Sequence, residues 1–332
     1  MSRVTLADIE AAARRIAGRV LRTPVVASPS LTARYGAPIL LKMEQRQTTG
    51  SFKLRGATNA LLSLTAEEKA RGVVAASTGN HGRGLAHAAA AEGVRCIVCM
   101  SALVPTNKVE AIRSLGAEIR IVGRSQDDAQ VEVDRLVAEA GMTMVPPFDQ
   151  AAVIAGQGTI GLEMVEDVPD VETILVPLSG GGLATGIAAA VKALRPSARA
   201  IGISMERGAA MQASLAAGKP VQVEELPTLA DSLGGGIGLD NRHTFAMARD
   251  LLDEVVLLSE EEIAAGIAHA YAEEREIVEG AGAVGIAALL AEKISSPAGP
   301  TVVVLSGHNI AMDLHRRIIC GETLTGDAPC PA

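Results

Sequence analysis

The chain of 332 residues has a formal net charge of −8, with 48% apolar and 2% aromatic residues. The acidic balance disfavours nucleic acid, whose phosphates are bound by clustered cations, and no stretch holds the roughly 18 uninterrupted apolar residues of a membrane span. We therefore predict a globular protein of one large or two medium domains that binds neither nucleic acid nor membrane.

The first twenty residues are amphipathic but partly acidic, which is not typical of a secretory signal, so we expect a cytoplasmic protein. From Val73 onward, short runs rich in β-forming residues alternate with helical patterns. Strands are predicted at residues 73–77, 95–100, 118–123 and 142–147, and helices at 81–93, 107–116 and 125–141. The alternation stops at Pro146 and Pro147.

A second series of the same kind follows. Helices are predicted at residues 156–168, 180–196 and 209–218, and strands at 172–178, 198–205 and, after two long helical patterns, 301–307. Strands and helices of these lengths form right-handed βαβ units on a parallel sheet covered on both faces. The sequence thus predicts an α/β protein with two sheets, one for each series.

The four cysteines do not indicate a metal site. Cys96 and Cys99 lie in an apolar run of strand character, and no second pair of cysteines or histidines lies nearby at the spacing of a zinc site. We expect both to be reduced thiols in the core.

Three glycines follow an apolar strand at Ser179-Gly-Gly-Gly-Leu183 and open a helix. Successive N–H groups and the helix dipole would converge there on one anion. A tight turn explains one glycine but not three in a row. The spacing departs from the dinucleotide fingerprint and from the nucleotide P-loop, so a single small phosphate is favoured.

Two other strand ends carry polar groups. Ser77-Thr-Gly-Asn-His81 leads into a helix, where hydroxyl and N–H groups suit a carboxylate, although Ser77 or Asn80 could merely cap that helix. Leu305-Ser-Gly-His-Asn309 ends the last strand, where α/β sheets place ligand contacts.

Lys53 lies between Phe52 and Leu54 behind a Gly-Ser turn. A lysine amine whose pKa is lowered by an apolar wall and a nearby cation can form a Schiff base, and Phe52 and Arg55 are suitable neighbours. A single-phosphate cradle, a carboxylate-binding turn and an activated lysine fit together in one cofactor, pyridoxal 5′-phosphate (PLP).

These motifs resemble the threonine/serine dehydratase and serine racemase family, which are fold-type-II PLP enzymes related to the tryptophan synthase β chain. The similarity runs from "LRTPVVASPSL" through "TTGSFKLRGA", "ASTGNHGRGLAHAA", "VPLSGGGLATGIA" and "VEGAGAVGIAALL" to "VVVLSGHN". It implies that Lys53 holds PLP as an imine, that Phe52 packs on the ring and that Asn80 bonds the ring hydroxyl. It also implies that Ser306 faces the pyridine nitrogen and that the phosphate is held by Ser179, Gly180, Gly181, Gly182 and Leu183.

The resemblance also implies a reaction. Ser77, Thr78 and His81 would receive the substrate carboxylate, and Lys53 would take the α-proton as the β-hydroxyl leaves. The resulting aminoacrylate or enamine would hydrolyse to a 2-keto acid and ammonia. Thr78 occupies the position of the second-face base of serine racemases, so racemisation is possible but less favoured than elimination.

Four further positions depart from the family pattern. Ser179 replaces the first of four glycines, and His308 replaces a glycine beside Ser306, where it either shapes the substrate pocket or lies at its rim. Ser204 and Ala209 stand where some relatives place acidic metal ligands, so we assign no metal.

Within the family, "RQTTGSFKLRGATNA", "LADSLGGGIGLDNRHTF" and "LSGHNIAMD" look most like the hydroxyectoine-utilisation dehydratases. The implied substrate is 3-hydroxy-2,4-diaminobutyrate, with Asp231, Asp240 or His308 as partners of its second amine. Alternatives are an L-threonine/L-serine ammonia-lyase or serine racemase with the same residues, a dinucleotide-dependent oxidoreductase, and a binding protein without catalysis.

The family also implies an architecture. We expect a large PLP-binding domain of residues 1–70 and 149–322, a small mobile α/β domain of residues 71–148, and a tail of residues 323–332. A homodimer is expected.

Overall fold

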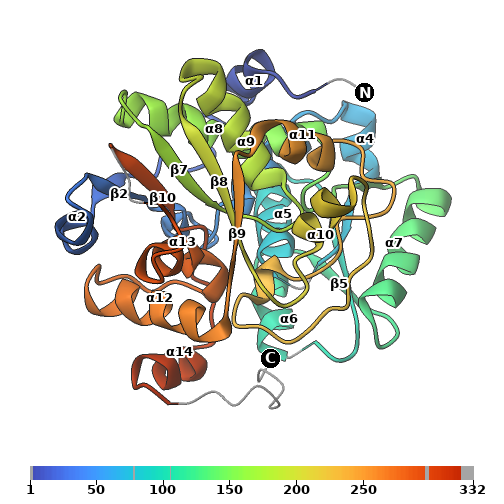
Figure 1. The fold of residues 1–332 in the computed structure, drawn as a ribbon. Coiled ribbons are helices and arrows are strands. Elements are labelled where there is room, and N and C mark those ends of the chain that lie inside the picture. The colour runs from blue at the N-terminus through green and yellow to red at the C-terminus, as the bar shows by residue number, and fades with distance from the viewer. Residues whose placement is uncertain (1–2, 78, 105, 296–298, 323–332) are drawn as a thin grey trace.

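The computed structural model describes residues 3–77, 79–104, 106–295 and 299–322, so the predicted tail lies outside the described residues. Its helices pack around two β-sheets (Figure 1). The larger sheet has the strand order β1-β2-β10-β7-β8-β9 and the smaller one β5-β4-β3-β6. All pairs are parallel except the antiparallel pair of β1 and β2. The predicted α/β fold with two mostly parallel sheets is confirmed.

Seven of the strands coincide with predicted ones, and β1, β2 and β9 were not predicted. The larger sheet contains β1 (Val25–Ala27), β2 (Ile39–Lys42), β7 (Thr173–Pro177), β8 (Arg199–Met205), β9 (Glu254–Leu258) and β10 (Thr301–Val304). The smaller contains β3 (Val73–Ala76), β4 (Cys96–Met100), β5 (Glu118–Ile121) and β6 (Thr143–Met144). The unpredicted β1 has no alternating burial, so its pairing with β2 defines it rather than its own pattern.

The helices cover both faces of each sheet (Figure 1). They are α1 (Leu6–Ile16), α2 (Pro29–Tyr35), α3 (Lys53–Leu62), α4 (Ala66–Arg71), α5 (Asn80–Ala91), α6 (Thr106–Arg113), α7 (Gln126–Ala140), α8 (Ala151–Asp167), α9 (Gly182–Leu194), α10 (Ala210–Ala217), α11 (Thr244–Leu251), α12 (Glu260–Ala272), α13 (Gly280–Leu290) and α14 (Met312–Ile319). Single 3₁₀ turns are η1 (Glu44–Arg46) and η2 (Asp231–Leu233). No helix of the described residues is long and apolar enough to cross a bilayer.

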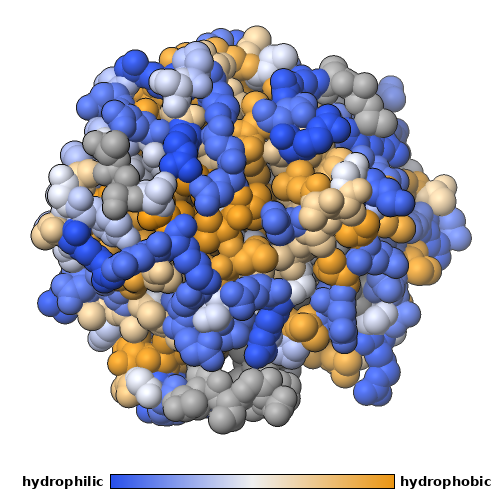
Figure 2. Space-filling model, in the orientation of Figure 1, coloured by the Kyte–Doolittle hydropathy of each residue, from blue (hydrophilic) through white to orange (hydrophobic). Residues whose placement is uncertain are grey.

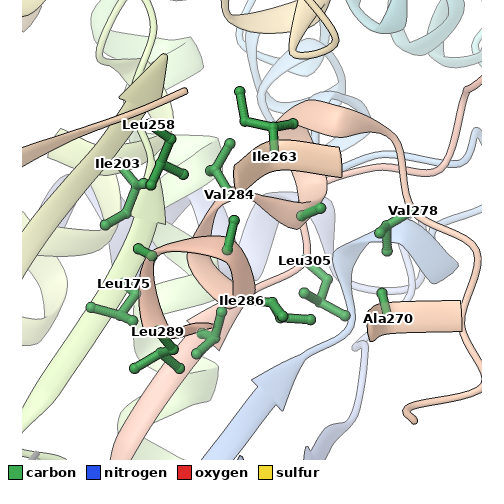
Figure 3. Close-up of a cluster of buried hydrophobic side chains, with 14 of the residues drawn as sticks. Leu175, Ile203, Leu258, Ile263, Ala270, Val278, Val284, Ile286, Leu289 and Leu305 are labelled. Carbon is green, nitrogen blue, oxygen red and sulfur yellow. The ribbon is translucent and has the colours of Figure 1, made fainter. Parts of the chain in front are cut away.

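Apolar side chains form the layer between the larger sheet and the helices α12 and α13. Figure 3 shows Leu175 and Ile203 of the sheet facing Val284 and Leu289 of α13, and these residues are almost fully buried. Removing this surface from water is the main force that holds helix and sheet together. On the outside, apolar residues gather in the middle of the face shown in Figure 2, among hydrophilic ones.

A buried group of charges fixes the position of α3. Arg55, which is fully buried, donates to Glu44 at 2.8 and 2.9 Å and to Glu163 of α8 at 2.6 and 2.9 Å. Lys42 at the end of β2 donates to the same Glu163 at 2.6 Å. Burial alone would raise the pKa of Glu44, but the Arg55 guanidinium outweighs it and lowers that pKa. Because a buried charge is costly without its partner, this group ties α3 to β2 and α8.

The strand order brings an early and a late segment of the chain together. β2 pairs with β10, so the residues after β2 run beside those after β10. The Phe52 N–H donates to the Ser306 carbonyl at 3.0 Å, and Ser51 forms a β-bridge with Gly307. Lys53, at the start of α3, is thereby placed next to the carboxyl end of β10, the edge at which α/β sheets bind ligands.

Candidate active site

Lys53 is partly buried at the first position of α3. Its Nζ donates to the Pro147 carbonyl at 2.9 Å and lies 5.3 Å from the centre of the Phe52 ring. Burial lowers the pKa of the Lys53 amine to about 8, and the Glu279 carboxylate opposes this shift. The amine is therefore a stronger nucleophile at neutral pH than an exposed lysine.

Arg55 does not serve as the cation beside Lys53, contrary to the sequence-based expectation. Its guanidinium is held by Glu44 and Glu163 in the buried charge group. Residues two positions apart on a helix point in different directions, so Lys53 and Arg55 cannot face each other from α3. The low pKa of Lys53 comes from burial instead.

The segment that follows β6 contacts both Lys53 and the glycine loop. The same segment that accepts the Lys53 hydrogen bond at Pro147 places the Phe148 ring against Gly180, where an added Cβ would lie 2.4 Å from a ring carbon. Gly181 has φ +92°, which strongly favours glycine, and Gly182 begins α9. The first-turn N–H groups of α9 have no partner within the helix and are free to bind an anion.

Asn80 and His81 are buried at the start of α5. The Asn80 amide donates to Glu279 Oε1 at 2.8 Å. His81 Nε2 lies 2.7 Å from the Val145 carbonyl, which can only accept, so Nε2 carries the proton. Burial and the Lys53 charge lower the pKa of His81 to about 3, which leaves a neutral ring with a lone pair on Nδ1. That lone pair cannot donate to a carboxylate, so an anion here would be bound by the His81 backbone N–H.

The remaining predicted residues follow strands of both sheets: Ser77 follows β3 of the smaller sheet, and Ser306 and His308 follow β10 of the larger one. Ser77 Oγ accepts from the Gly82 N–H in the first turn of α5 at 3.1 Å, a bond that does not use its own hydroxyl proton. Ser306 is buried with its Oγ 3.4 Å from the Ala281 carbonyl. His308 is exposed, and an added Cβ on Gly50 would lie 2.5 Å from its ring. Thr78 lies outside the described residues.

The comparison with known proteins agrees with this geometry. The family described as "Pyridoxal-phosphate dependent enzyme" matches residues 16–307. The chain belongs to this family. Its threonine/serine dehydratase and serine racemase branch is indicated by relatives over nearly the whole chain.

Three members of that branch illustrate the similarity. A protein of Sinorhizobium fredii, provisionally named a threonine dehydratase, is 63% identical over 97% of each chain. The L-threonine ammonia-lyase of Thermotoga maritima is 42% identical over 95% of this chain and 78% of its own. The structure of maize serine racemase superposes with a TM-score of 0.90 at 33% identity, covering 95% of this chain and 97% of that one. The chain is a PLP-dependent lyase.

The described residues fit PLP. Buried polar atoms without a partner include Thr49 Oγ1, Ser51 Oγ, His81 Nδ1 and Glu279 Oε2, and these residues either precede Lys53 in its turn or interact electrostatically with it. Buried polar atoms normally have partners, so this set indicates a polar ligand. When bound, PLP supplies an aldehyde that joins an amine and a ring that withdraws electrons from the substrate.

Among the described residues of this PLP enzyme, no group of three or more His, Cys, Asp or Glu side chains could hold a metal ion. Asp231 lies in η2 and acts electrostatically on Glu279. Asp240 is exposed in the turn of residues 238–241. Cys96 and Cys99 are buried as predicted, and burial raises the pKa of Cys96 to about 12.

Two functional candidates, Glu279 and Arg83, were missed from the sequence, and Asn309 was noted only as the end of a polar motif, with no role assigned. Burial raises the pKa of Glu279 to about 7, and Asp231 adds to the shift. Asn309 bonds Asn80, and Arg83 bonds Asn309. The available signal was the polar side chains within "VEGAGA" and "NHGR". The hydrogen-bond partners, however, are separated by 199, 226 and 229 positions along the chain.

The pKa of Lys53 predicts how the binding of PLP depends on pH. Only the neutral amine attacks the aldehyde, and the neutral fraction rises with pH up to the pKa of about 8. The rate of the absorbance change on adding PLP to cofactor-free protein should rise about tenfold for each pH unit below that value and level off above it. A midpoint of about 10.4, the ordinary value for lysine, would contradict the assignment.

Proposed function

We propose that the chain eliminates water from a 3-hydroxy amino acid, with release of a 2-keto acid and ammonia. The observation that carries this proposal is the partly buried amine of Lys53, whose pKa is about 8, beside the glycine loop at residues 180–182. In the net reaction the substrate loses its α-proton and its β-hydroxyl, and one water then replaces the α-amine. No oxidant or reductant is needed.

Each residue of the site has a separate role in this proposal. Lys53 Nζ binds PLP, accepts the proton from the substrate α-carbon and later returns a proton. Phe52 packs on the ring, and Ser179, Gly180, Gly181, Gly182 and Leu183 hold the phosphate. The N–H groups that open α5 bind the substrate carboxylate, with Ser77, Thr78 and His81 as the proposed residues. Ser306 offers a hydroxyl rather than a carboxylate to the pyridine nitrogen, which weakens the ring as an electron sink and favours elimination over transamination.

The substrate that we propose is 3-hydroxy-2,4-diaminobutyrate derived from hydroxyectoine. The likeness of three motifs to hydroxyectoine-utilisation dehydratases supports it. So does Asp231, which lies close enough to Glu279 to raise the pKa of that carboxyl group. An acidic side chain at this position would attract the second ammonium group of such a substrate.

L-threonine or L-serine is the second candidate. Relatives at 40 to 42% identity are named L-threonine ammonia-lyase in Thermotoga maritima and catabolic L-threonine dehydratase in Escherichia coli. Racemisation of serine would need a base on the second face, for which Thr78 is the candidate.

Initial rates on the three amino acids, measured side by side, separate these proposals. We expect the highest kcat/KM for 3-hydroxy-2,4-diaminobutyrate. Asp231→Asn should lower that value about tenfold, the size of one charged hydrogen bond, and leave L-serine within about twofold. Asp240→Asn is the matched control and should change neither. A strong preference for L-threonine would reverse the ranking, and chiral analysis of serine after incubation reports racemisation.

We further propose a homodimer of the cytoplasm with a large domain of residues 1–70 and 149–322 and a small mobile domain of residues 71–148. The small domain is supported by the smaller sheet, because all strands of that sheet lie between Val73 and Met144. Closure of the small domain would exclude water from the site during the reaction.

A further inference from the structure

Four side chains form an unbroken line of hydrogen bonds beside Lys53. Arg83 Nη1 donates to Asn309 Oδ1 at 3.1 Å. Asn309 Nδ2 donates to Asn80 Oδ1 at 2.6 Å and to the Thr49 carbonyl at 3.0 Å. Asn80 Nδ2 in turn donates to Glu279 Oε1 at 2.8 Å. The line begins at a cation and ends at a carboxyl group.

The chemistry of its ends fixes the direction of every bond. An arginine can only donate, and a backbone carbonyl can only accept. Asn309 must therefore turn its oxygen toward Arg83 and its nitrogen toward Thr49, and both of its N–H groups are then used. The oxygen and nitrogen of an amide have similar shapes, so their positions are assigned here from the hydrogen-bond partners.

The orientation of Asn80 follows from that of Asn309. Because Asn309 presents an N–H, the Asn80 oxygen must accept it, and the Asn80 nitrogen must face Glu279. Asn80 is 7% exposed and Glu279 3% exposed, so water offers no alternative partners for a reversed amide. An amide nitrogen carries two protons, and Glu279 takes only one of them. One N–H of Asn80 is left to donate.

Other charged groups near Glu279 do not remove this bond. Lys53 and Arg83 attract its carboxylate, while Asp231 opposes it. A carboxyl group can accept a hydrogen bond whether or not it is ionised. The bond from Asn80 therefore does not depend on the charge of Glu279.

We propose that Arg83, Asn309 and Glu279 are positioning residues that hold the Asn80 amide so that it presents a hydrogen-bond donor, not an acceptor, to the ring oxygen of PLP. The inference rests on the proposed roles of Lys53 and Asn80 in holding the cofactor. A donor stabilises the anionic form of the ring oxygen. It therefore strengthens cofactor binding and lowers the pKa of the proton that this oxygen would carry. An acceptor in the same place would do the opposite.

The decisive variant is Asn309→Asp, which has nearly the same shape but no N–H. Its carboxylate can still pair with Arg83, but it loses the bond to the Thr49 carbonyl and would face the Asn80 oxygen, which forces that amide to reverse. We expect the Kd of PLP for cofactor-free protein to rise about tenfold, the loss of roughly one charge-assisted hydrogen bond. The pH midpoint of the visible absorbance of bound cofactor should rise as well.

A second substitution distinguishes reversal of the amide from general damage. A reversed Asn80 would turn its oxygen toward Glu279, which at pH 8, above its pKa of about 7, is mostly ionised and cannot donate, whereas glutamine can. Asn309→Asp should therefore lower the melting temperature at pH 8, and adding Glu279→Gln should restore most of that loss but leave the Kd of PLP raised. Glu279→Gln alone keeps an acceptor and should change the Kd less than about threefold. Glu276→Gln, an acid three residues away that pairs with Arg46, is the matched control and should leave the Kd unchanged.

An unchanged Kd in Asn309→Asp would overturn the proposal, and so would recovery of both stability and Kd in the double variant. If Asn309→Asp fails to fold, the double variant alone decides, because a raised Kd with a wild-type melting temperature supports the reversal and an ordinary Kd contradicts it. Failure of the proposed function looks different. In that case wild-type protein treated with PLP and borohydride would carry no label on Lys53.

Discussion

Replacing Lys53 with alanine should abolish both the visible absorbance that PLP gives the protein and all measurable turnover of amino acids. The Lys53 amine is partly buried and its pKa is lowered to about 8, so it can form the covalent bond with PLP. It is also the group that we propose to move the α-proton. Loss of a residue with two roles should reduce kcat by about a millionfold, the scale seen when a unit of catalytic groups is removed.

The measurement combines a visible spectrum, a turnover assay and borohydride reduction followed by mass analysis of peptides. Lys219→Ala is a suitable control, because Lys219 is exposed and follows the end of α10. The control should keep the spectrum, the activity and a borohydride label at Lys53. Retention of either colour or activity by Lys53→Ala would show that another amine holds the cofactor, and the assignment of the site would be wrong.

Local patterns predicted most of the fold, because the strands of a parallel sheet are short apolar runs and their helices repeat with a period near 3.6. The positions of β3, β4, β7, β8 and β10 follow from such runs. The glycine loop was equally visible, since three consecutive glycines between a strand and a helix are more than a tight turn requires. The strand β9 was missed because its residues Glu254–Leu258 lie inside a long region of helical pattern.

Contacts between distant parts of the chain could not be predicted in this way. Glu279 meets Asn80 from 199 positions away, and the sequence around it is typical of a small-residue helix that packs closely. Arg55 shows the opposite error, since closeness in sequence suggested a role beside Lys53. The direction of side chains on α3 instead sends Arg55 into the charge group with Glu44 and Glu163. A helix assigned at Lys53–Leu62 from the sequence would have excluded that role.

A valine at position 181 should weaken PLP binding by at least about 100-fold while the protein still folds. Gly181 has φ +92°, where a β-branched side chain costs roughly 1–3 kcal/mol. Its added Cβ would also lie 2.9 Å from Met211 Cε and 3.0 Å from Thr244 Cβ, which adds an overpacking cost of about 1–3 kcal/mol. In the cofactor-free variant, the loop would relax to a different conformation that relieves this strain. Binding of the phosphate would have to restore the strained conformation, so the cost would appear as a higher Kd of PLP.

Gly218→Val separates contact with the cofactor from backbone strain alone. Gly218 also has positive φ, at +69°, but nothing lies within 4 Å of an added Cβ, and it ends α10 rather than opening α9. Both variants should lose thermal stability, because both place valine in the left-handed region. Only Gly181→Val should raise the Kd of PLP, measured by titration of cofactor-free protein. Equal effects on that Kd would mean that strain anywhere in the fold weakens binding. The assignment of residues 179–183 as the phosphate-binding loop would then be contradicted.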